Sequence, residues 1–437
     1  MNRSHKKAKD FLLRYGMDYT TVDMEKCSRD YIDEMEKGLA EADAGSLQMI
    51  PTFLDAEKEI PKNTPVIALD AGGTNFRTAT VYFNDTGSPV IEDFNVFPMP
   101  GLEENLSCQQ FFTQVAGYLT HNIDVSEKVG FCFSYPLEML RNHDGRLTRF
   151  TKEVKAKEVE GRLIGEELNS AIKGVMRRKP KSMVLLNDTV ATLLAGRSAF
   201  QDQTFDSYIG FILGTGMNCC YIEGNDKILK EPDLPAGASQ IINVESGAYG
   251  RAPRGELDAL FDLSTDSPGK SLYEKMISGG YLGQMILTVI KKGAEEGLFS
   301  PASRESFGRI SLLDTKDTGE FFQSPGGDNL LSRCIPEAEA EDREVLYFLI
   351  ARLMERAAKF VAVTLGSVVT KSGKGRSRCA PVCITADGST FYKFKSYQDT
   401  IKYYLKKFLV DGKNRYYDFV QVENAPLVGA AIAGLMA

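Results

Sequence analysis

The chain has very few histidines, the side chain that most readily exchanges protons near neutral pH. His5, His121 and His143 are the only three, and they are too scattered in the sequence to predict a metal cluster or a catalytic triad. We therefore expect any proton transfer by this protein to use carboxylates.

Long apolar runs and basic blocks are absent as well. Nowhere do about eighteen apolar residues follow one another, which argues against a membrane-spanning helix. The basic start, Met1–Lys9, is not followed by an apolar core of signal-peptide length, so we expect a cytoplasmic protein. The net charge of −7 gives no reason to expect a nucleic acid or an acidic membrane as partner.

Cysteine is sparse and lies mostly in apolar sequence, which is typical of free thiols that serve as small core residues. The eight positions are Cys27, Cys108, Cys132, Cys219, Cys220, Cys334, Cys379 and Cys383. Only Cys379 and Cys383 come near metal-ligand spacing, and no second pair accompanies them. We therefore predict no zinc site.

What the chain does contain is enough for a large soluble fold. Its 437 residues, 43% of them hydrophobic and 25% charged, predict two or three globular domains.

The stretch from Val66 to Phe83 predicts two strands joined by a glycine turn. Val66–Leu69 is β-branched and apolar enough for a buried strand. Gly72 and Gly73 let the backbone turn and approach a large anion, because no side chain keeps the anion away and successive N–H groups can point inward. A phosphate group fits this description, and an ordinary β-turn is the alternative.

Polar residues around this turn favour the phosphate interpretation. Thr74 adds a hydroxyl donor and Arg77 a fork of donors. Asp70, where the first strand ends, offers a carboxylate able to hold Mg²⁺ or its waters.

The rest of the chain predicts alternating strands and helices. Residues 1–60 have the periodicity of surface helices, and a helix from Cys108 to about Thr120 begins after a capping residue, Ser107. The other expected elements are strands at Val90–Pro98, Lys128–Ser134, Ser182–Leu186 and Ala380–Thr385, helices at Asn187–Ala199, 271–296 and 341–370, and an amphipathic stretch at Ala425–Met436.

A second hairpin repeats the first one. A strand at Ser207–Leu213, a turn at Gly214-Thr-Gly216 and a strand at Met217–Glu223 predict two similar halves that face a cleft. With a third turn, Asp387-Gly-Ser389, these turns describe a nucleotide held from both sides. We expect its phosphates between the first two turns and its adenosine near the third.

Several blocks in one order resemble motifs of the eukaryotic-type hexokinases, members of the sugar kinase, actin and Hsp70 superfamily. Asp70-x-Gly-Gly-Thr-Asn-Phe-Arg77 is similar to that family's first phosphate motif, and Leu213-Gly-Thr-Gly-Met-Asn-Cys-Cys-Tyr221 to its second. The blocks that resemble sugar-side and catalytic motifs are Phe131–Pro136, Thr151-Lys152, Asn187–Leu193, Ile242–Gly250 and Pro268–Gly283.

The resemblance implies an α/β fold of the two-lobed actin-like ATPase (ribonuclease H-like) type with a central cleft. Residues 1–65 would form a helical segment that packs on the large domain. Residues 66–200 would form the small domain, to which a helix at 425–437 returns, and residues 201–424 the large domain.

The resemblance also implies a reaction, ATP-dependent phosphorylation of a hexose at its 6-hydroxyl, with Mg²⁺ as cofactor and glucose favoured. Asp188 would be the general base, because the attacking hydroxyl needs a nearby carboxylate to take its proton. From position alone, a helix N-cap is an equal alternative for Asp188. Lys152 would neutralise charge near the transferred phosphoryl group, with a solvated lysine as the alternative.

Two sets of residues carry these implied binding roles. Sugar hydroxyls would be bound by Ser134, Thr151, Lys152, Asn187, Asp188, Asn218, Glu245 and Gln284. The nucleotide would be bound by Asp70, Gly72, Gly73, Thr74, Asn75, Arg77, Gly214, Thr215, Gly216, Asp387, Gly388 and Ser389, with Asp70 also the metal residue.

The chain departs from the family pattern at three places. Gln284 stands where these kinases usually carry a sugar-binding glutamate, and Ser246 replaces a tryptophan. Val422-Glu-Asn-Ala-Pro-Leu-Val-Gly429 replaces the Ser-Gly-Lys-Gly-like adenosine loop, and its Pro426 fixes φ and removes a donor.

Three hypotheses follow. The first is a hexose 6-kinase whose lobes close when sugar binds; the second is a kinase for another hexose or an amino sugar, suggested by Gln284. The third is a non-catalytic sugar sensor. In each case the partners are small molecules, a hexose and a nucleotide, and the protein is a monomer or a homodimer.

Overall fold

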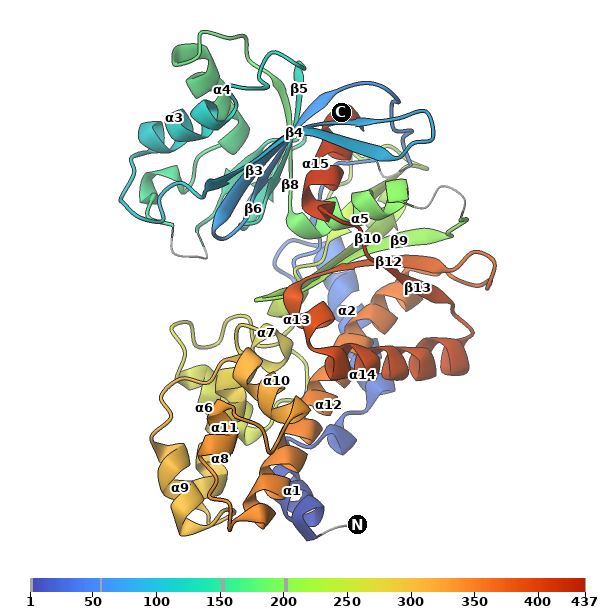
Figure 1. The fold of residues 1–437 in the computed structure, drawn as a ribbon. Coiled ribbons are helices and arrows are strands. Elements are labelled where there is room, and N and C mark those ends of the chain that lie inside the picture. Colours follow the sequence, from blue (N-terminus) through green and yellow to red (C-terminus); the bar gives the residue numbers. More distant parts are fainter. Residues whose placement is uncertain (1–2, 56, 151–153, 200–202, 437) are drawn as a thin grey trace.

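Two lobes, each built around an open mixed sheet, make up the computed structural model (Figure 1). It describes residues 3–55, 57–150, 154–199 and 203–436. Thr151 and Lys152, to which we assign sugar and phosphoryl roles, lie outside the described residues.

The sheet of the upper lobe in Figure 1 has the strand order β4-β3-β2-β5-β8. Its strands are β2 (Val66–Ala71), β3 (Asn75–Phe83), β4 (Pro89–Pro98), β5 (Lys128–Phe133) and β8 (Ser182–Leu186). The first three pair antiparallel, whereas β5 and β8 run parallel to β2. The predicted hairpin and the predicted strands around it are confirmed.

The sheet of the lower lobe repeats this arrangement, with the order β11-β10-β9-β12-β13. Its strands are β9 (Ser207–Leu213), β10 (Met217–Gly224), β11 (Ser239–Asn243), β12 (Val382–Asp387) and β13 (Tyr417–Val420). Here too, three antiparallel strands are followed by two parallel ones. A short strand, β1 (Ile50–Pro51), extends the sheet beside β11. The prediction of two similar halves is therefore confirmed.

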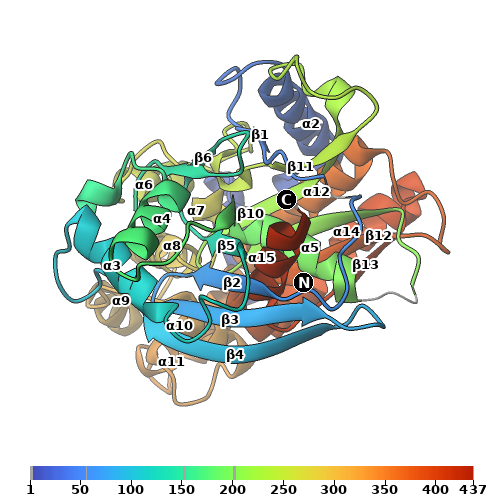
Figure 2. The same cartoon turned by 90° about the horizontal axis from the view of Figure 1, so that it is seen from above.

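Two helices, α5 (Asp188–Ala199) and α15 (Ala425–Met436), lie between the sheets (Figures 1 and 2). They approach so closely that a Cβ on Gly429 would lie 1.9 Å from the carbonyl oxygen of Ala191. The prediction that the C-terminal stretch is amphipathic is wrong, because every described residue of α15 except Pro426 is buried. The C-terminal helix is thus apolar on all sides because it packs against both α5 and the first sheet.

Other helices cover the outer face of the upper sheet. There α3 (Cys108–Tyr118) begins at the predicted cap, since Ser107 Oγ accepts from the Gln110 N–H and the Gln110 side chain accepts from the Ser107 N–H. The neighbouring elements are β6 (Leu137–Met139), β7 (Gly145–Leu147), η2 (Lys157–Val159) and α4 (Ile164–Gly174).

The lower lobe is organised around α12 (Ala340–Ser372), onto which α1 (Arg3–Arg14), α2 (Met24–Ala40) and α14 (Lys395–Leu405) pack. Its remaining elements are η1 (Tyr19–Thr21), η3 (Asn225–Lys227), η4 (Ser246–Ala248), α6 (Glu256–Leu263), α7 (Glu274–Ile277), α8 (Leu282–Glu295), α9 (Pro301–Gly308), α10 (Thr315–Gln323), α11 (Leu330–Arg333), α13 (Ser389–Lys393) and η5 (Lys406–Asp411). No helix in the described ranges, α12 included, is long and apolar enough to cross a membrane.

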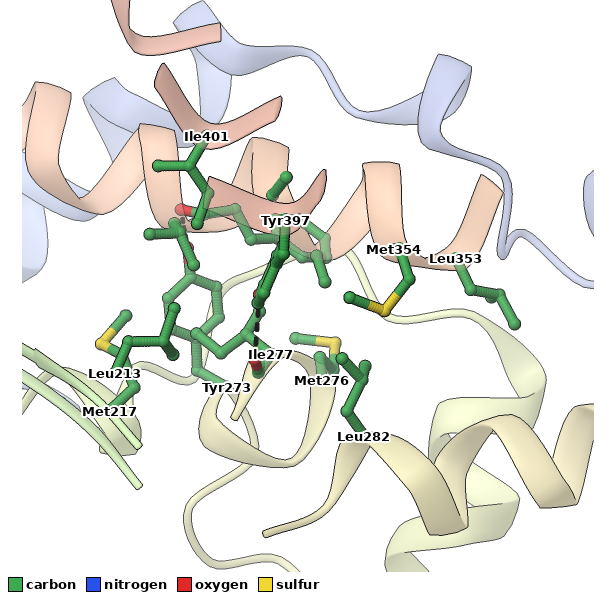
Figure 3. Close-up of a cluster of buried hydrophobic side chains, with 14 of the residues drawn as sticks. Leu213, Met217, Tyr273, Met276, Ile277, Leu282, Leu353, Met354, Tyr397 and Ile401 are labelled. Atoms are coloured by element: carbon green, nitrogen blue, oxygen red, sulfur yellow. Dashed lines mark hydrogen bonds between the residues drawn. The ribbon is translucent and has the colours of Figure 1, made fainter. Parts of the chain in front are cut away.

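The prediction of one helix over 271–296 is wrong in one respect, because this segment forms two helices, α7 and α8. The backbone between them turns at Ser278–Tyr281, where two glycines follow each other. Apolar side chains from several elements surround this break, among them Met217, Tyr273, Met276 and Tyr397 (Figure 3). The Tyr397 hydroxyl donates to the Ile277 carbonyl at 2.9 Å and so fixes the end of α7.

Candidate active site

The first glycine turn follows the carboxyl end of β2, the central strand of the upper sheet. The Gly72 N–H donates to the Asn75 carbonyl at 3.0 Å and closes the turn. Asp70 and Arg77 face each other in the β2–β3 register, and Arg77 Nη1 lies 2.6 Å from Asp70 Oδ2. The carboxylate expected to serve Mg²⁺ and the guanidinium expected to serve phosphate are therefore paired with each other.

Three parallel strands bring the predicted polar residues of the upper lobe to one edge. Because β2, β5 and β8 are parallel neighbours, their carboxyl ends meet there. Asp70 lies near the end of β2, Ser134 follows β5, and Asn187 and Asp188 follow β8. The Ser134 N–H donates to the Ala71 carbonyl at 3.1 Å, which fixes its position beside the first turn.

Asp188 is the first residue of α5, the helix that it would cap if it were not the general base. The Thr189 N–H is shared between Asn187 Oδ1 at 2.9 Å and Asp188 Oδ1 at 2.8 Å. Asn187, which precedes the helix, therefore supplies a cap by itself. Helix capping does not account for the choice of an aspartate at position 188.

Two predicted sugar residues of the lower lobe, Asn218 and Glu245, form a hydrogen-bonded group with Asn243. Glu245 Oε1 accepts from Asn243 Nδ2 at 2.8 Å and from Asn218 Nδ2 at 3.3 Å. Asn218 Nδ2 also donates to Asn243 Oδ1 at 2.8 Å, and Asn218 Oδ1 accepts from the Ser246 N–H at 3.2 Å. These bonds hold the Glu245 carboxylate in a single orientation.

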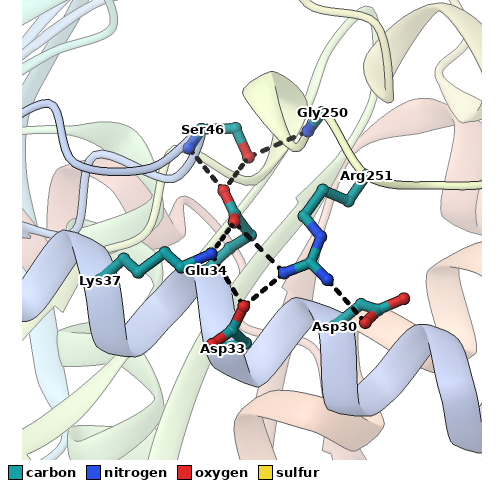
Figure 4. A network of polar contacts seen from close by, with 7 residues as sticks. All are labelled: Asp30, Asp33, Glu34, Lys37, Ser46, Gly250 and Arg251. Atoms are coloured by element: carbon teal, nitrogen blue, oxygen red, sulfur yellow. Dashed lines mark hydrogen bonds and ion pairs between the residues drawn. The ribbon is translucent and has the colours of Figure 1, made fainter.

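The backbone around Glu245 is strained and firmly held. Glu245 has φ +59°, in the left-handed region that non-glycine residues rarely adopt. The chain beyond it is bound to α2 and to the segment that follows α2, as Figure 4 shows: Arg251 Nη2 lies 2.9 Å from Asp30 Oδ1 of α2, and Ser46 Oγ, after the helix, accepts from the Gly250 N–H at 3.0 Å. Glu34 accepts from both the backbone and the hydroxyl of Ser46 and extends this network.

A pocket with about 320 Å³ of space not filled by atoms, part of it open to solvent, lies between the two lobes. Its polar lining includes Asn187 from the upper lobe and Asn243 and Glu245 from the lower lobe. The remaining lining residues are Ile50, Thr52, Tyr135, Leu137, Met139, Leu186 and Val190.

The charge of Asp188 acts on two other carboxyl groups, Asp70 and Glu245. Burial raises the pKa of Asp70, the nearby Arg77 opposes that rise, and the charge of Asp188 raises it further. Burial also raises the pKa of Glu245; the amide of Asn243 opposes the rise, and Asp188 again adds to it. Asp188 therefore lies within electrostatic reach of both the phosphate side and the sugar side of the site.

The second and third turns lie against each other in the lower lobe. Gly388 has φ +111°, and a Cβ there would lie 2.3 Å from the Leu213 carbonyl oxygen, so only glycine fits. Asp387 Oδ1 accepts from the Gly388 N–H at 2.7 Å, and Thr390 Oγ1 donates to the Gly214 carbonyl at 2.9 Å. The second and third turns are thus held directly against each other.

The segment between α7 and α8 supports the second turn. The N–H groups of Gly279 and Gly280 donate to the carbonyls of Gly214 and Thr215 at 2.8 and 2.9 Å. Gln284 follows in the first turn of α8 and is half-buried. No bond from its side chain to another predicted sugar residue is found among the described contacts.

Two contributors escaped the sequence analysis. Asn243 lies two residues before Glu245 and bonds its carboxylate, and strand alternation, which puts alternate residues on one face, was the signal that could have found it. Thr390 follows the third turn and bonds the second; only the fold brings these turns together.

Two lobes with the same sheet repeated, and glycine turns at the ends of their strands, define the actin-like ATPase fold. Two sequence models, both described as Hexokinase, match this chain over residues 12–198 and 208–436. The chain belongs to the hexokinase family.

Relatives and solved structures agree with this assignment. Hexokinase-2 of Rattus norvegicus is 29% identical over 446 residues, covering 97% of this chain and 47% of that protein. Hexokinase-2 of Homo sapiens is 30% identical over 402 residues, covering 87% and 43%. The chain thus spans less than half the length of these relatives. A hexokinase from Schistosoma mansoni complexed with glucose has the same fold, with a TM-score of 0.80 and 24% identity over 100% of this chain and 99% of that one.

Proposed function

We propose that this protein transfers the terminal phosphoryl group of ATP to the 6-hydroxyl of a hexose, with glucose as the first candidate. The single observation that carries the proposal is the place of Asp188. It follows Asn187, which lines the pocket together with Glu245, and its strand β8 ends at the same edge of the sheet as β2, which carries Asp70. A base for this reaction must lie between the phosphate and the hydroxyl that attacks it.

The hydrogen-bonded side chains of Asn218, Asn243 and Glu245 suit a ligand with several hydroxyl groups. Each sugar hydroxyl can donate and accept, so amides and carboxylates that converge on it can satisfy both roles. Glu245, Asn218 and Asn187 would orient the ring, with Ser134, Thr151 and Gln284 as further contributors. In this orientation Asp188 Oδ takes the proton of the 6-hydroxyl as that oxygen attacks.

The turns suit a nucleotide with Mg²⁺. Gly72–Asn75 and Gly214–Gly216 would hold phosphates through the backbone N–H groups that do not close these turns, and Asp387–Ser389 would hold the nucleoside side. Within the described residues no three acidic, histidine or cysteine side chains gather to hold a metal alone. Asp70 would therefore share Mg²⁺ with phosphate oxygens and waters, and the ion would neutralise phosphate charge.

The replaced adenosine loop does not oppose ATP binding on conformational grounds. Pro426 is the second residue of α15, in the first helical turn, where a backbone N–H has no partner within the helix. Closure of the two lobes over the sugar, with Lys152 brought to the phosphoryl group, completes the proposal.

The test is turnover by the purified protein. Mg²⁺·ATP is mixed with glucose, other hexoses and amino sugars, and both sugar phosphate and ADP are measured. We expect a hexose 6-phosphate in equal amount to ADP, and the hexose turned over fastest identifies the substrate. Binding of glucose with no product would instead establish a sugar sensor.

A further inference from the structure

Glu274, in α7, lies between the second phosphate turn and the turn that carries Glu245. Its Oε2 accepts from the Met217 N–H at 2.9 Å, directly after Gly216. A Cβ on Gly216 would lie 2.6 Å from this oxygen, and a Cβ on Gly247 would lie 3.1 Å from it. One carboxylate oxygen therefore touches both turns, at positions where a larger residue would displace it.

The surroundings of Glu274 are those of an internal group, not a surface one. Burial raises its pKa, while the Met217 N–H and the charge of Lys275 oppose the rise. The Lys275 ammonium itself is bound elsewhere, 2.5 Å from Asp262 Oδ1. The charge of Glu274 also reaches Glu245 and raises the pKa of that carboxyl group.

The residues after Glu274 complete its contact with the second turn. The backbone of Gly279 and Gly280 binds Gly214 and Thr215, as described above, and Glu274 binds the residue that follows Gly216. This one short segment thus contacts the second turn along its whole length, and the Glu274 side chain continues to the turn of Glu245.

We propose that Glu274 is a positioning residue that couples sugar binding at Glu245 to the shape of the second phosphate turn. The inference rests on the proposed function. A shift of residues 245–248 on sugar binding presses Gly247 against the Glu274 carboxylate, and the bond to Met217 N–H carries the shift to Gly214–Gly216. Sugar and nucleotide then bind more tightly together than either does alone.

Two conservative variants test this coupling, because they separate the length of the side chain from its charge. Glu274→Gln keeps the length and an oxygen acceptor, whereas Glu274→Asp keeps the charge but is one methylene too short. Calorimetry measures glucose binding with and without a non-hydrolysable ATP analogue and Mg²⁺. We expect the wild type and Glu274→Gln to bind glucose at least about fivefold more tightly with the analogue, and Glu274→Asp to lose this gain while its affinity for glucose alone changes less than about threefold.

Glu223→Gln is the matched control. Glu223 is a buried carboxylate near the far end of β10, the strand that begins at Met217, and it is bound by Tyr221 and Lys371. This variant is expected to lower thermal stability and to keep the coupling. The inference is overturned if Glu274→Asp keeps the coupling, if Glu274→Gln loses it, or if Glu274→Asp loses glucose affinity in parallel with stability. A wild type that shows the coupling without turnover would refute the proposed reaction and leave this inference standing.

Discussion

Arg77 Nη1 lies 2.6 Å from Asp70 Oδ2, so the cation and the carboxylate of the first phosphate turn are bound to each other. Only 4% of the Asp70 side chain is exposed, against 37% of the Arg77 side chain. Burial raises the pKa of Asp70 and Arg77 opposes that rise. The pair therefore opposes protonation of a buried carboxylate at the place where the proposed metal would be needed.

Replacing Arg77 with alanine is expected to destabilise the protein in a way that depends on pH. Because the folded pKa of Asp70 lies above 3.8, its contribution to stability is present below that pH and is lost as pH rises through the folded pKa. Without Arg77 the folded pKa rises further, so the deficit relative to wild type should grow as pH rises above the folded pKa of the wild-type Asp70 and reach about 1 to 2 kcal/mol, since Arg77 is partly exposed. Urea unfolding at several pH values measures it.

Arg178→Ala is the control for this experiment. Arg178 makes two bonds of 2.8 Å to Asp124, but both side chains are exposed, so stability should change little at any pH. An Arg77→Ala deficit that stays constant with pH would contradict the role given to Asp70.

Asp188 can be tested as base against its role at the start of α5. Asp188→Asn keeps an oxygen for the Thr189 N–H but cannot take a proton. We expect kcat to fall about 10²- to 10⁴-fold in both Asp188→Asn and Asp188→Ala, with glucose affinity within about threefold of wild type. If Asp188 were only a cap, the asparagine variant would retain full activity and the alanine variant would lose about 0.5 to 2 kcal/mol of stability.

Asp144→Asn provides a matched control for this pair of variants. Asp144 accepts from the N–H groups of Gly165 and Glu166 at 2.7 and 3.0 Å, at the start of α4 and apart from the pocket between the lobes. Stability is expected to fall, whereas kcat is expected to stay at the wild-type value.

The strands and the glycine turns could be predicted because their signals are local. An apolar β-branched run ended by Asp70 and two glycines predicts a strand and a sharp turn wherever it occurs. Even the pairing of Asp70 with Arg77 is contained in the hairpin register, because they lie opposite each other across the turn.

The predictions that were wrong depend on contacts between residues that are far apart in the sequence. The apolar periodicity of 271–296 continues through Ser278–Tyr281, but bonds from Gly279 and Gly280 to the second turn replace helical ones. The burial of α15 on all sides arises from two neighbours, α5 and the upper sheet, that sequence periodicity cannot show together. The adjacency of the second and third turns likewise follows from the parallel pairing of β9 and β12.

Glucose affinity is expected to rise with pH in the acid range. The pKa of Glu245 is raised above 4.5, mainly by burial, and an ionised carboxylate is the stronger acceptor for sugar hydroxyls. Affinity should therefore increase as pH rises through the folded pKa, whereas the contribution of Glu245 to stability is lost over the same range. Calorimetry from about pH 4.5 to pH 8 measures the effect, and Glu245→Gln should remove most of the slope. Asp188 and Glu274 also face Glu245, so a slope that is unchanged in Glu245→Gln would assign it to one of them.

Gln284→Glu should restore the family's charge and improve sugar binding. Gln284 is the third residue of α8, where a negative charge interacts favourably with the helix N-terminus, so stability should be unchanged or rise by about 0.3 to 1 kcal/mol. A charged acceptor makes stronger bonds to hydroxyls, and we expect KM for glucose to fall about 3- to 10-fold with kcat little changed. Gln110→Glu is the matched control, because Gln110 is the third residue of α3 in the other lobe and carries the same change. Equal KM changes in both variants, or an unchanged KM in Gln284→Glu, would show that position 284 does not contact the sugar.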